Sequence, residues 1–362
     1  MDKLLVAGAL GLVGRAVIDR FCHRPGLQTV GLARRAADFA PQTTWVRADL
    51  RDADGTRDAL AAHRDTTHLV YAALNEQPQL TQGWRDPANM ALNTQMLANT
   101  LQALDGAPLR HITLLQGTKA YGVHTGRPMR VPAREPDALQ DHVNFYFDQQ
   151  RLVAARAQRD GCAWTALRPQ IVLGLAVGGA MNPVATLGVQ VALCRALGEP
   201  LCYPGHANLL TECTDARLIA EAVEWAWHAP QAQGEVFNIT NGDVVLWRSV
   251  FDRLAVQFGL PLGEPRPERL ADVMPRHAGL WRQIAEREGL RVADLGALIG
   301  LSWQYADATY ASQRPFAVPP LVSTVKLRQA GFGACIDTED CIVDHLLAMQ
   351  LHGYLPRLGR VG

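Results

Sequence analysis

The chain has 362 residues, of which 48% are hydrophobic and 19% charged, and its 35 basic and 35 acidic residues cancel. This composition excludes a disordered protein, and the length allows about two domains. The neutral charge balance argues against a nucleic-acid partner, and no apolar run approaches the ~20 residues that span a membrane. The seven scattered cysteines include no Cys-x-x-Cys pair, which is typical of a reducing compartment and predicts a cytoplasmic protein.

Short apolar strands alternate with amphipathic helices through the first half of the chain. The expected strands are 3–7, 28–33, 44–47, 68–72, 111–115 and 163–167, and the clearest helices are 89–104 and 144–159. This alternation predicts an α/β fold with a doubly wound, Rossmann-type parallel sheet and helices on both faces. A helix at 215–227 and a strand at 235–240 are expected to return to the same sheet.

The remaining segments lack this alternation and are expected to form a smaller, mostly helical domain. We therefore assign 1–173 and 209–241 to an NADP-binding Rossmann domain, and 174–208 and 242–362 to a substrate-binding cap. Open α/β sheets bind ligands at the carboxyl ends of their strands, where such a cap would lie. Analogy with proteins of this fold suggests a homodimer.

A glycine-spaced turn joins the first expected strand to the helix that follows it. Gly8, Gly11 and Gly14 stand three residues apart, and Leu10, Leu12 and Val13 lie among them. Glycine allows a tight turn and close backbone approach, while the helix directs free N–H groups at a pyrophosphate. We expect these residues to bind a dinucleotide; the alternative is a turn that only reverses the chain.

The end of the second strand distinguishes the two nicotinamide cofactors. Folds that bind NAD place an acidic residue here to hold the ribose hydroxyls. This chain has Arg34 and Arg35, whose guanidinium groups can bind a 2′-phosphate, so the predicted cofactor is NADPH/NADP⁺. The alternative is a pair of solvated surface arginines. Further cofactor contacts are expected at the ends of other strands, from Asp49, Leu50, Ala72, Ala73, Pro169, Ile171 and Val172.

The predicted catalytic residues are Tyr146 and Lys119. Tyr146 opens a helix, but Gln150 stands four residues later, so the Tyr-x-x-x-Lys pair of ordinary short-chain dehydrogenases/reductases is missing. The chain has only three lysines, and Lys119 follows the fifth strand, beside the expected nicotinamide. A compact ammonium suits that place better than a guanidinium. The alternatives are a surface lysine and a packed aromatic residue.

These segments resemble the progesterone 5β-reductase/iridoid synthase family of atypical short-chain reductases. The resemblance rests on LQGTKAYG at 115–122, NFYF at 144–147, the glycine turn, Arg168-Pro169 and WQYAD at 303–307. It implies reduction of a carbon–carbon double bond conjugated to a carbonyl, with hydride delivered by NADPH to the β-carbon. It also implies that Tyr146 donates to the carbonyl oxygen, while Lys119 keeps the tyrosine acidic and binds the nicotinamide ribose.

The chain departs from the family pattern near the expected pocket. Phe147 replaces the family's second tyrosine, and Gln149-Gln150 follow where acids are frequent. Gly117 stands where ordinary extended reductases use a serine. Because these departures change the groups of the expected pocket, the resemblance predicts the class of reaction and not an individual substrate.

The remaining candidates are the residues of the substrate site. Leu74 and Tyr121 match pocket positions of the family, and Asn93 matches an asparagine used inside the helix after the fourth strand. Substrate contact is also expected from Phe147, Met181 and Phe316, with core packing as the alternative for each. None of the eleven histidines was assigned to a metal-ligand spacing, so no metal site is predicted.

The leading hypothesis is an NADPH-dependent enone reductase whose partner is a small molecule with a conjugated carbonyl. An NADPH-dependent carbonyl reductase, or a nucleotide-sugar epimerase or dehydratase, would share the fold and the cofactor. A regulator that senses NADP without turnover is the alternative from another class of protein. The tyrosine–lysine pair favours chemistry over sensing.

Overall fold

The computed structural model describes residues 1–127, 129–313 and 319–359. Its contacts divide the chain into two compact units. The first contains Met1–Gln170, Ala216–Thr240 and Val322–Ala334, and the second contains Ile171–Asp215, Asn241–Leu321 and Cys335–Gly362. These boundaries differ from those expected from the sequence, which assigns 322–334 to the cap and 171–173, 209–215 and 241 to the Rossmann domain. Residues 322–334 join the first unit because helix α13 (Val325–Gln329) packs beside strand β10 (Glu235–Ile239).

The first unit is built on a seven-stranded sheet in the order β10-β6-β5-β4-β1-β2-β3. Every neighbouring pair of these strands runs parallel. Besides β10, the sheet contains β1 (Asp2–Ala7), β2 (Leu27–Ala33), β3 (Thr44–Arg47), β4 (His68–Tyr71), β5 (His111–Leu115) and β6 (Ala163–Pro169). The order reverses between β1 and β4, as in a doubly wound Rossmann sheet, so the predicted fold class is confirmed.

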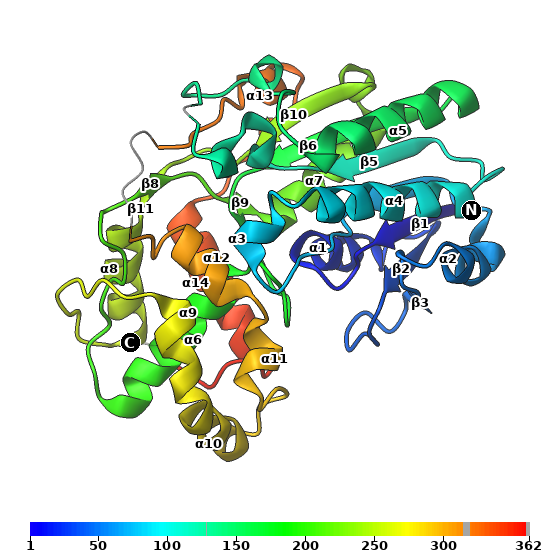
Figure 1. Cartoon of the computed structure of the whole chain (residues 1–362). Helices are drawn as coiled ribbons and strands as arrows, with labels where there is room; N and C mark the ends of the chain where they lie inside the picture. The colour runs from blue at the N-terminus through cyan, green and yellow to red at the C-terminus, as the bar shows by residue number, and fades with distance from the viewer. Residues whose placement is uncertain (128, 314–318, 360–362) are drawn as a thin grey trace. The chain divides into compact units, whose positions relative to one another are not determined.

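The helices of this unit pack in two sets against the sheet. Besides α13, they are α1 (Leu12–Phe21), α2 (Ala53–Leu60), α3 (Leu80–Gly83), α4 (Pro87–Ala103), α5 (Phe145–Asp160) and α7 (Ala216–His228), with short 3₁₀ turns η1 (Ala61–His63), η2 (Thr118–Tyr121), η3 (Val123–Thr125), η4 (Glu135–Asp137) and η5 (Pro230–Ala232). Helix α1 packs beside α7, and α4 lies between α2 and α5 (Figure 1). Right-handed crossovers put α1 and α4 on opposite faces, because β1 leads to β2 on one side and β4 leads to β5 on the other. Strands covered on both faces are continuously apolar, as Leu4, Leu5 and Val6 illustrate, each fully buried.

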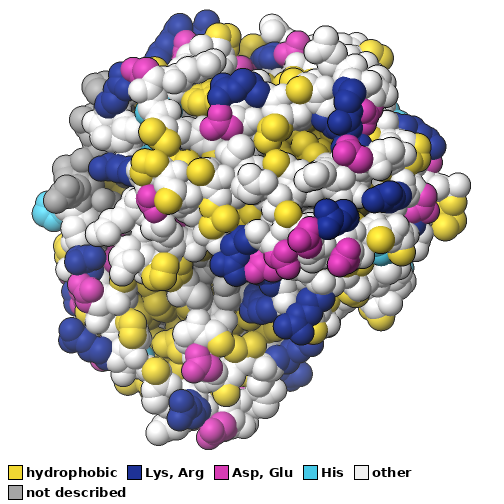
Figure 2. Space-filling view, turned by 45° about the vertical axis from the view of Figure 1, so that its right-hand side comes forward, with side chains coloured by type: hydrophobic (Ala, Val, Ile, Leu, Met, Phe, Trp, Pro, Cys, Tyr) yellow, Lys and Arg dark blue, Asp and Glu magenta, His cyan; other side chains and the backbone are white. Residues whose placement is uncertain are grey.

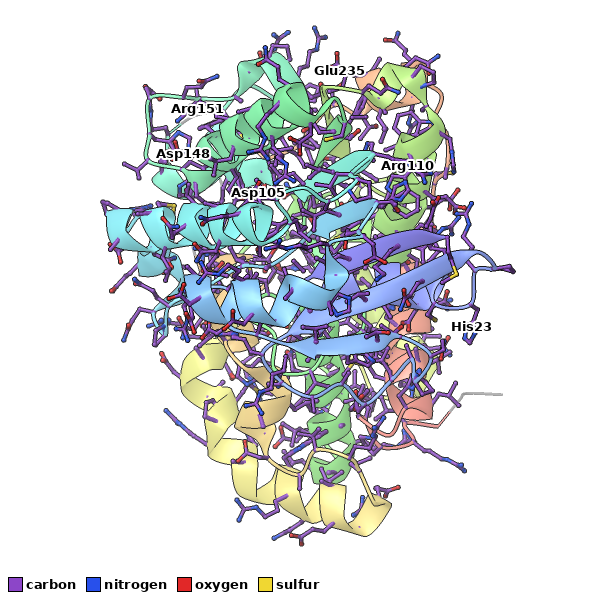
Figure 3. All side chains as sticks on the ribbon, turned by 90° about the vertical axis from the view of Figure 1, so that its right-hand side faces the viewer. His23, Asp105, Arg110, Asp148, Arg151 and Glu235 are labelled. Atoms are coloured by element: carbon purple, nitrogen blue, oxygen red, sulfur yellow. The ribbon has the colours of Figure 1, made fainter. Side chains whose placement is uncertain are left out.

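Arg156 fastens the end of α4 to α5. Its side chain is 4% exposed, and its guanidinium donates to carbonyl oxygens at the end of α4 and to the Asp105 carboxylate. A cation at this position offsets the partial negative charge of a helix C-terminus. On the outer face of α5, Asp148 and Arg151 form an ion pair one turn apart; Figure 3 labels both, together with Asp105. The contacts of Arg156 hold α4 and α5 together.

Two buried histidines occupy partner positions on neighbouring strands, and they predict a loss of stability in acid. His68 on β4 pairs in register with His111 on β5, and burial lowers their pKa values to about 4 and about 3. Because both folded pKa values lie below the unfolded value near 6.5, the unfolded chain binds more protons as the pH falls from about 7. We expect the free energy of unfolding to fall from pH 7 to pH 4, with His111 contributing roughly 3 kcal/mol.

Denaturant unfolding measured across this pH range checks the expectation. His111→Asn should flatten the dependence of the unfolding free energy on pH. The exposed His206 provides a control, since His206→Asn should leave the dependence as in the unsubstituted protein. A pH dependence that His111→Asn does not change would contradict the assignment.

The second unit is mostly helical, as expected. Its helices are α6 (Pro183–Leu197), α8 (Trp247–Phe258), α9 (Leu270–Val273), α10 (Ala278–Glu288), α11 (Leu295–Ile299), α12 (Ser302–Ala308) and α14 (Thr338–Leu351), with the 3₁₀ turn η6 (Met274–His277). Two small sheets pair β7 (Val172–Leu173) with β9 (Thr214–Asp215), and β8 (Leu210–Thr211) with β11 (Val245–Leu246). Its core contains fully buried aromatic side chains, among them Trp247, Trp281 and Tyr310.

The surface carries charges of both signs. On the face that Figure 2 draws, basic and acidic side chains are interspersed, and apolar side chains lie among them. Within the described residues, none of the helices has the length and apolar character needed to cross a bilayer.

Candidate active site

The glycine turn fits closely against the neighbouring strand of the sheet. Gly8 has φ +80°, and a Cβ added there would lie 2.7 Å from Ala72 O and from Ala73 N, just beyond β4. At Gly14 a Cβ would lie 2.3 Å from Gly8 O. Neither position has room for a side chain, so the backbone itself forms the surface of the turn. This is the point between β1 and β4 where doubly wound folds bind dinucleotides.

The start of α1 has the free donors that a pyrophosphate requires. Gly11 is the N-cap, it is exposed, and its N–H donates to Gly8 O at 3.0 Å. No side chain caps this helix, so the N–H groups of its first turn remain available to a ligand. Leu12 and Val13 are half-buried beside it. A cradle without Cβ atoms beneath a helix N-terminus fits the diphosphate of a nicotinamide dinucleotide.

The residues expected around the adenosine end lie after β2 and β3. Arg34 and Arg35 are both exposed. The Asp49 carboxylate forms an ion pair with Arg51 at 2.5 Å, and this hydrogen-bonded partner lowers the pKa of Asp49. Leu50 is buried, and its carbonyl oxygen accepts from Asn99. The guanidinium groups of Arg34 and Arg35 therefore present positive charge to solvent at the end of β2.

One asparagine side chain links the backbones of the two predicted catalytic residues. Asn144 is the N-cap of α5, and its Oδ1 accepts from the backbone N–H of Tyr146 at 3.0 Å. Its Nδ2 donates to the carbonyl oxygen of Lys119, also at 3.0 Å. The same carbonyl lies 3.1 Å from His142 Nε2. Tyr146 and Lys119 are thus fixed to a common buried amide although they are distant in sequence.

Gly117 leaves room for the Tyr146 hydroxyl. A Cβ at Gly117 would lie 3.2 Å from the Tyr146 hydroxyl oxygen, so a serine there would crowd the phenol. Gln116, just before it, donates through Nε2 to the Tyr146 carbonyl oxygen and to Gln150. Gln150, which replaces the lysine of the ordinary motif, therefore has a structural hydrogen bond. The Tyr146 ring is 6% exposed and packs among Met90, Ala120, Phe145 and Phe147.

The Lys119 side chain is mostly buried, and its ion-pair partner is a buried carboxylate. Its side chain is 15% exposed, and Nζ lies 3.7 Å from Oε1 of Glu76, whose side chain is 7% exposed. Burial lowers the pKa of Lys119, and the Glu76 carboxylate opposes that shift. The other two lysines pair with exposed carboxylates, since Asp65 and Glu235 are 67% and 45% exposed. Lys119 is therefore the one of the three lysines whose counter-ion is shielded from water.

The predicted substrate residues divide into four groups. Leu74 and Phe147 pack in the apolar cluster around Tyr146. Tyr121 is 1% exposed, and its hydroxyl donates to Asn238 at 2.5 Å, which favours core packing over substrate contact. Met181 belongs to the second unit, as do the cofactor candidates Ile171 and Val172, whereas Pro169 ends β6. Phe316 lies outside the described residues.

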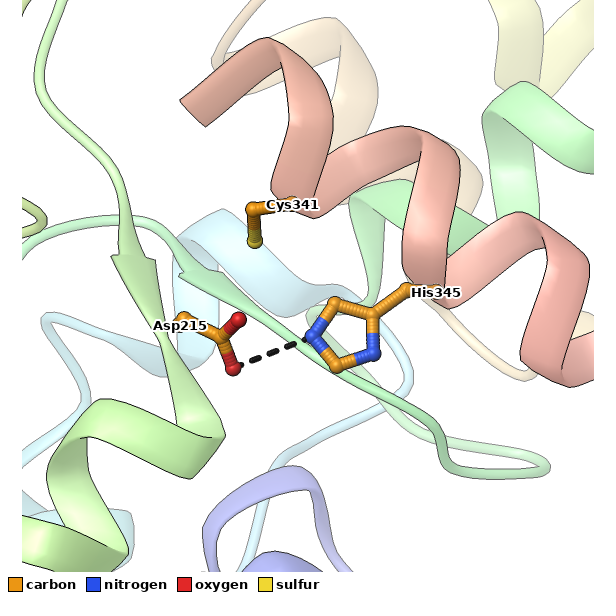
Figure 4. Close-up of side chains that lie close together, drawn as sticks. All are labelled: Asp215, Cys341 and His345. Carbon is orange, nitrogen blue, oxygen red and sulfur yellow. Dashed lines mark hydrogen bonds and ion pairs between the residues drawn. The ribbon is translucent and has the colours of Figure 1, made fainter. Parts of the chain in front are cut away.

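The structure also brings together a group of metal-ligand residue types that sequence reasoning passed over. Asp215, Cys341 and His345 are buried, and one ligand atom of each lies within 4.8 Å of the others (Figure 4). Cys341 and His345 stand one turn apart on α14, a Cys-x-x-x-His spacing visible in the sequence. His345 Nε2 lies 3.1 Å from Asp215 Oδ1, so a buried hydrogen bond between these two side chains accounts for both polar atoms.

Comparisons with known proteins find relatives that match most of the chain. Residues 8–174 match a family of NAD(P)H-binding domains. The chain is 30% identical to 3-oxo-Delta(4,5)-steroid 5-beta-reductase of Arabidopsis thaliana, covering 84% of this chain and 81% of that protein. It is 28% identical to (S)-8-oxocitronellyl enol synthase CYC2 of Camptotheca acuminata, covering 97% of this chain and 93% of that protein.

Solved structures share the fold at lower identity. UDP-glucose 4-epimerase of Thermotoga maritima superposes with a TM-score of 0.67 at 14% identity, covering 96% of this chain and 99% of that one. The Bordetella bronchiseptica enzyme WbmG, in complex with NAD and UDP, gives 0.65 at 17% identity, covering 97% and 96%. At these identities the likeness concerns the extended short-chain dehydrogenase/reductase fold alone.

Proposed function

Because the chain belongs to the progesterone 5β-reductase/iridoid synthase family of oxidoreductases, we propose that it reduces the carbon–carbon double bond of α,β-unsaturated carbonyl compounds. The observation that carries the proposal is the pair of Tyr146 and Lys119, joined through Asn144 at the carboxyl ends of the strands. The expected cofactor is NADPH, which supplies the hydride for the β-carbon when it is bound.

The chain's own groups would bind the cofactor and stabilise the developing charge. The turn at Gly8, Gly11 and Gly14 would hold the pyrophosphate, and Arg34 and Arg35 the 2′-phosphate. The Tyr146 hydroxyl would donate to the carbonyl oxygen as negative charge appears there in an enolate. A preorganised donor aimed at such charge is a large part of catalysis. Lys119 would bind the ribose hydroxyls and favour the ionised form of the phenol.

The apolar surroundings of the tyrosine support a hydrophobic substrate. Leu74, Phe147 and Met90 pack in one cluster with the Tyr146 ring. An apolar wall beside one hydroxyl donor is typical of sites that hold a small organic molecule and orient its single polar group. We therefore assign the cluster to the substrate side of Tyr146.

A comparison of substrates tests this function. NADPH absorbance should decay with 2-cyclohexen-1-one and stay constant both without substrate and with a saturated aldehyde such as hexanal. Decay with the aldehyde alone would support a carbonyl reductase instead. NADPH binding without decay in any mixture would support the regulator that senses NADP.

Arg34 and Arg35 should determine the preference for NADPH. Replacing both by alanine removes two guanidinium groups that are exposed at the end of β2. Charge-assisted hydrogen bonds of this kind contribute about 1.5–3 kcal/mol each, so KM for NADPH should rise at least about tenfold. KM for NADH should change little, because NADH has no 2′-phosphate.

The control is the exposed pair Arg282 and Arg287 on α10. Alanine at both positions should leave both Michaelis constants as they are. An equal rise of KM for NADPH and NADH in the Arg34/Arg35 variant would remove the assignment to the 2′-phosphate.

A further inference from the structure

Glu76 is a buried carboxylate that the proposed reaction has not used. Its side chain is 7% exposed, and its Oε1 lies 3.7 Å from Lys119 Nζ. Within the described part of the chain, this oxygen has no hydrogen-bond partner. Removing a carboxylate from water carries a large free-energy cost unless a positive charge compensates it. Lys119 is that compensation, so the two groups depend on each other.

The loop that carries Glu76 is fixed on both sides of the residue. The backbone N–H of Asn75 donates to Asn93 Oδ1 at 2.8 Å, and its side chain donates to Asn89 Oδ1 at 2.9 Å. On the other side, Gln77 donates to Asp86 at the start of α4. The anchors come from one face of α4, where Asn89 and Asn93 are one turn apart and almost fully buried. The loop therefore holds Glu76 in one position.

Without Glu76, the Lys119 ammonium would have no negatively charged group among the neighbours named here to offset its burial. Burial lowers the pKa of Lys119, and burial together with Lys119 lowers that of His124 to about 4. Nζ also lies 4.8 Å from the centre of the Trp84 ring, which favours a cation but carries no net charge. The titratable or charged groups nearby come from five segments: Glu76 after β4, Arg85 after α3, His124 in η3, His142 before α5 and Tyr146 in α5. Among these five groups, Glu76 alone carries a carboxylate that can compensate the charge of Lys119.

We propose that Glu76 is a positioning residue for the reaction, because its buried carboxylate keeps the Lys119 ammonium charged and fixed beside the nicotinamide site. The role of Glu76 in catalysis rests on the proposed function. The electrostatic coupling between Glu76 and Lys119 does not, because it can be measured without turnover. It assigns Glu76 no contact with the substrate. A glutamate that only completed the packing of the loop would not change the protonation of Lys119.

The small number of lysines makes a direct test possible. Protein labelled with ¹³C at the lysine Cε carbons should give three signals, because the chain has three lysines. The Lys119→Arg variant identifies the Lys119 signal by its disappearance. Glu76→Gln keeps the size of the side chain and removes its charge, so the Lys119 signal should titrate at least about one pH unit lower, which is a tenfold change in the protonation equilibrium.

Turnover should follow the same shift. In Glu76→Gln, the basic limb of the profile of kcat/KM against pH should move down by the same amount, so that kcat/KM at a fixed pH on that limb falls about tenfold while the value at the plateau is kept. Glu76→Asp restores the charge on a shorter chain and should return the limb toward its original position.

The matched control is Glu235→Gln, which removes the partner of Lys326. That ion pair spans 2.6 Å but lies at the surface, where water screens the charge. The Lys326 signal and the pH profile should change little in this variant. An unchanged Lys119 titration in Glu76→Gln would overturn the inference.

The two proposals fail in different ways. If the unsubstituted enzyme does not reduce an enone, the proposed function is wrong, while the lysine titration still decides whether Glu76 controls the charge of Lys119. If Glu76→Gln does not fold, the unsubstituted protein provides the test. Its Lys119 signal should then show a second step in acid, where Glu76 takes up a proton. A single step at the pH of an ordinary lysine would reject the coupling.

Discussion

Tyr146→Phe should lower kcat for enone reduction by about 10²–10³-fold, the usual effect of removing one oxyanion donor. The substitution deletes one oxygen atom from a ring that is 6% exposed and packed in an apolar cluster. The hydroxyl points toward Gly117, which has no side chain to take its place. The ring packing, the cap of α5 and the glycine turn stay intact. The dissociation constant of NADPH should therefore change less than about threefold.

Stopped-flow absorbance and a binding titration measure these two quantities separately. The control is Tyr71→Phe, another buried tyrosine, whose hydroxyl has no hydrogen-bond partner among the described residues. It should keep normal turnover. Full activity in Tyr146→Phe would mean that another donor serves the carbonyl oxygen.

Gly8→Ala should both destabilise the protein and weaken cofactor binding. Alanine is strained at φ +80°, and its Cβ would lie 2.7 Å from the backbone beyond β4. Strain of this kind costs about 1–3 kcal/mol, and overpacking against backbone costs a similar amount. The turn would have to move away from β4 and take the start of α1 with it. We expect a loss of about 3 kcal/mol in unfolding free energy and at least a tenfold rise in the dissociation constant of NADPH.

Two other glycines separate the effect of backbone strain from the effect of crowding by the added Cβ. Gly26 has φ +78° with nothing within 4 Å of an added Cβ, so Gly26→Ala measures backbone strain without crowding. Gly14 does not adopt a positive φ, but its Cβ would lie 2.3 Å from Gly8 O, so Gly14→Ala measures crowding without that strain. Gly26→Ala should leave NADPH binding unchanged, and Gly14→Ala should weaken it. Equal NADPH affinity in all three variants would exclude the turn as the cofactor site.

The first unit could be predicted closely because its signals are local. Expected and observed limits of β3 and β5 coincide, and those of β1, β2, β4 and α5 differ by one or two residues. Periodicity identifies a strand buried on both faces or a helix with one apolar face. The contact of 322–334 with β10 could not be found in this way, because that segment comes from far along the chain and carries no sheet pattern of its own.

Some residues of the candidate site have a signal in the sequence and others have none, because a signal of this kind is local along the chain. Tyr146 and Lys119 could be proposed as catalytic residues because lysine is rare in this chain and because both motifs resemble a family. Glu76 gave no signal, since its burial depends on Asn89 and Asn93, which hold its loop from another helix. The Cys341–His345 spacing could have been noticed, whereas Asp215 joins them only through the fold.

The double role of Asn144 has a consequence for motion. Its side chain holds the first turn of α5 with one end and the η2 segment with the other. Local opening usually proceeds in cooperative units, and a shared polar anchor makes one unit of what would be two. Amide protons in both segments should then exchange with solvent at a common rate, so that Tyr146 and Lys119 are displaced together whenever either segment opens.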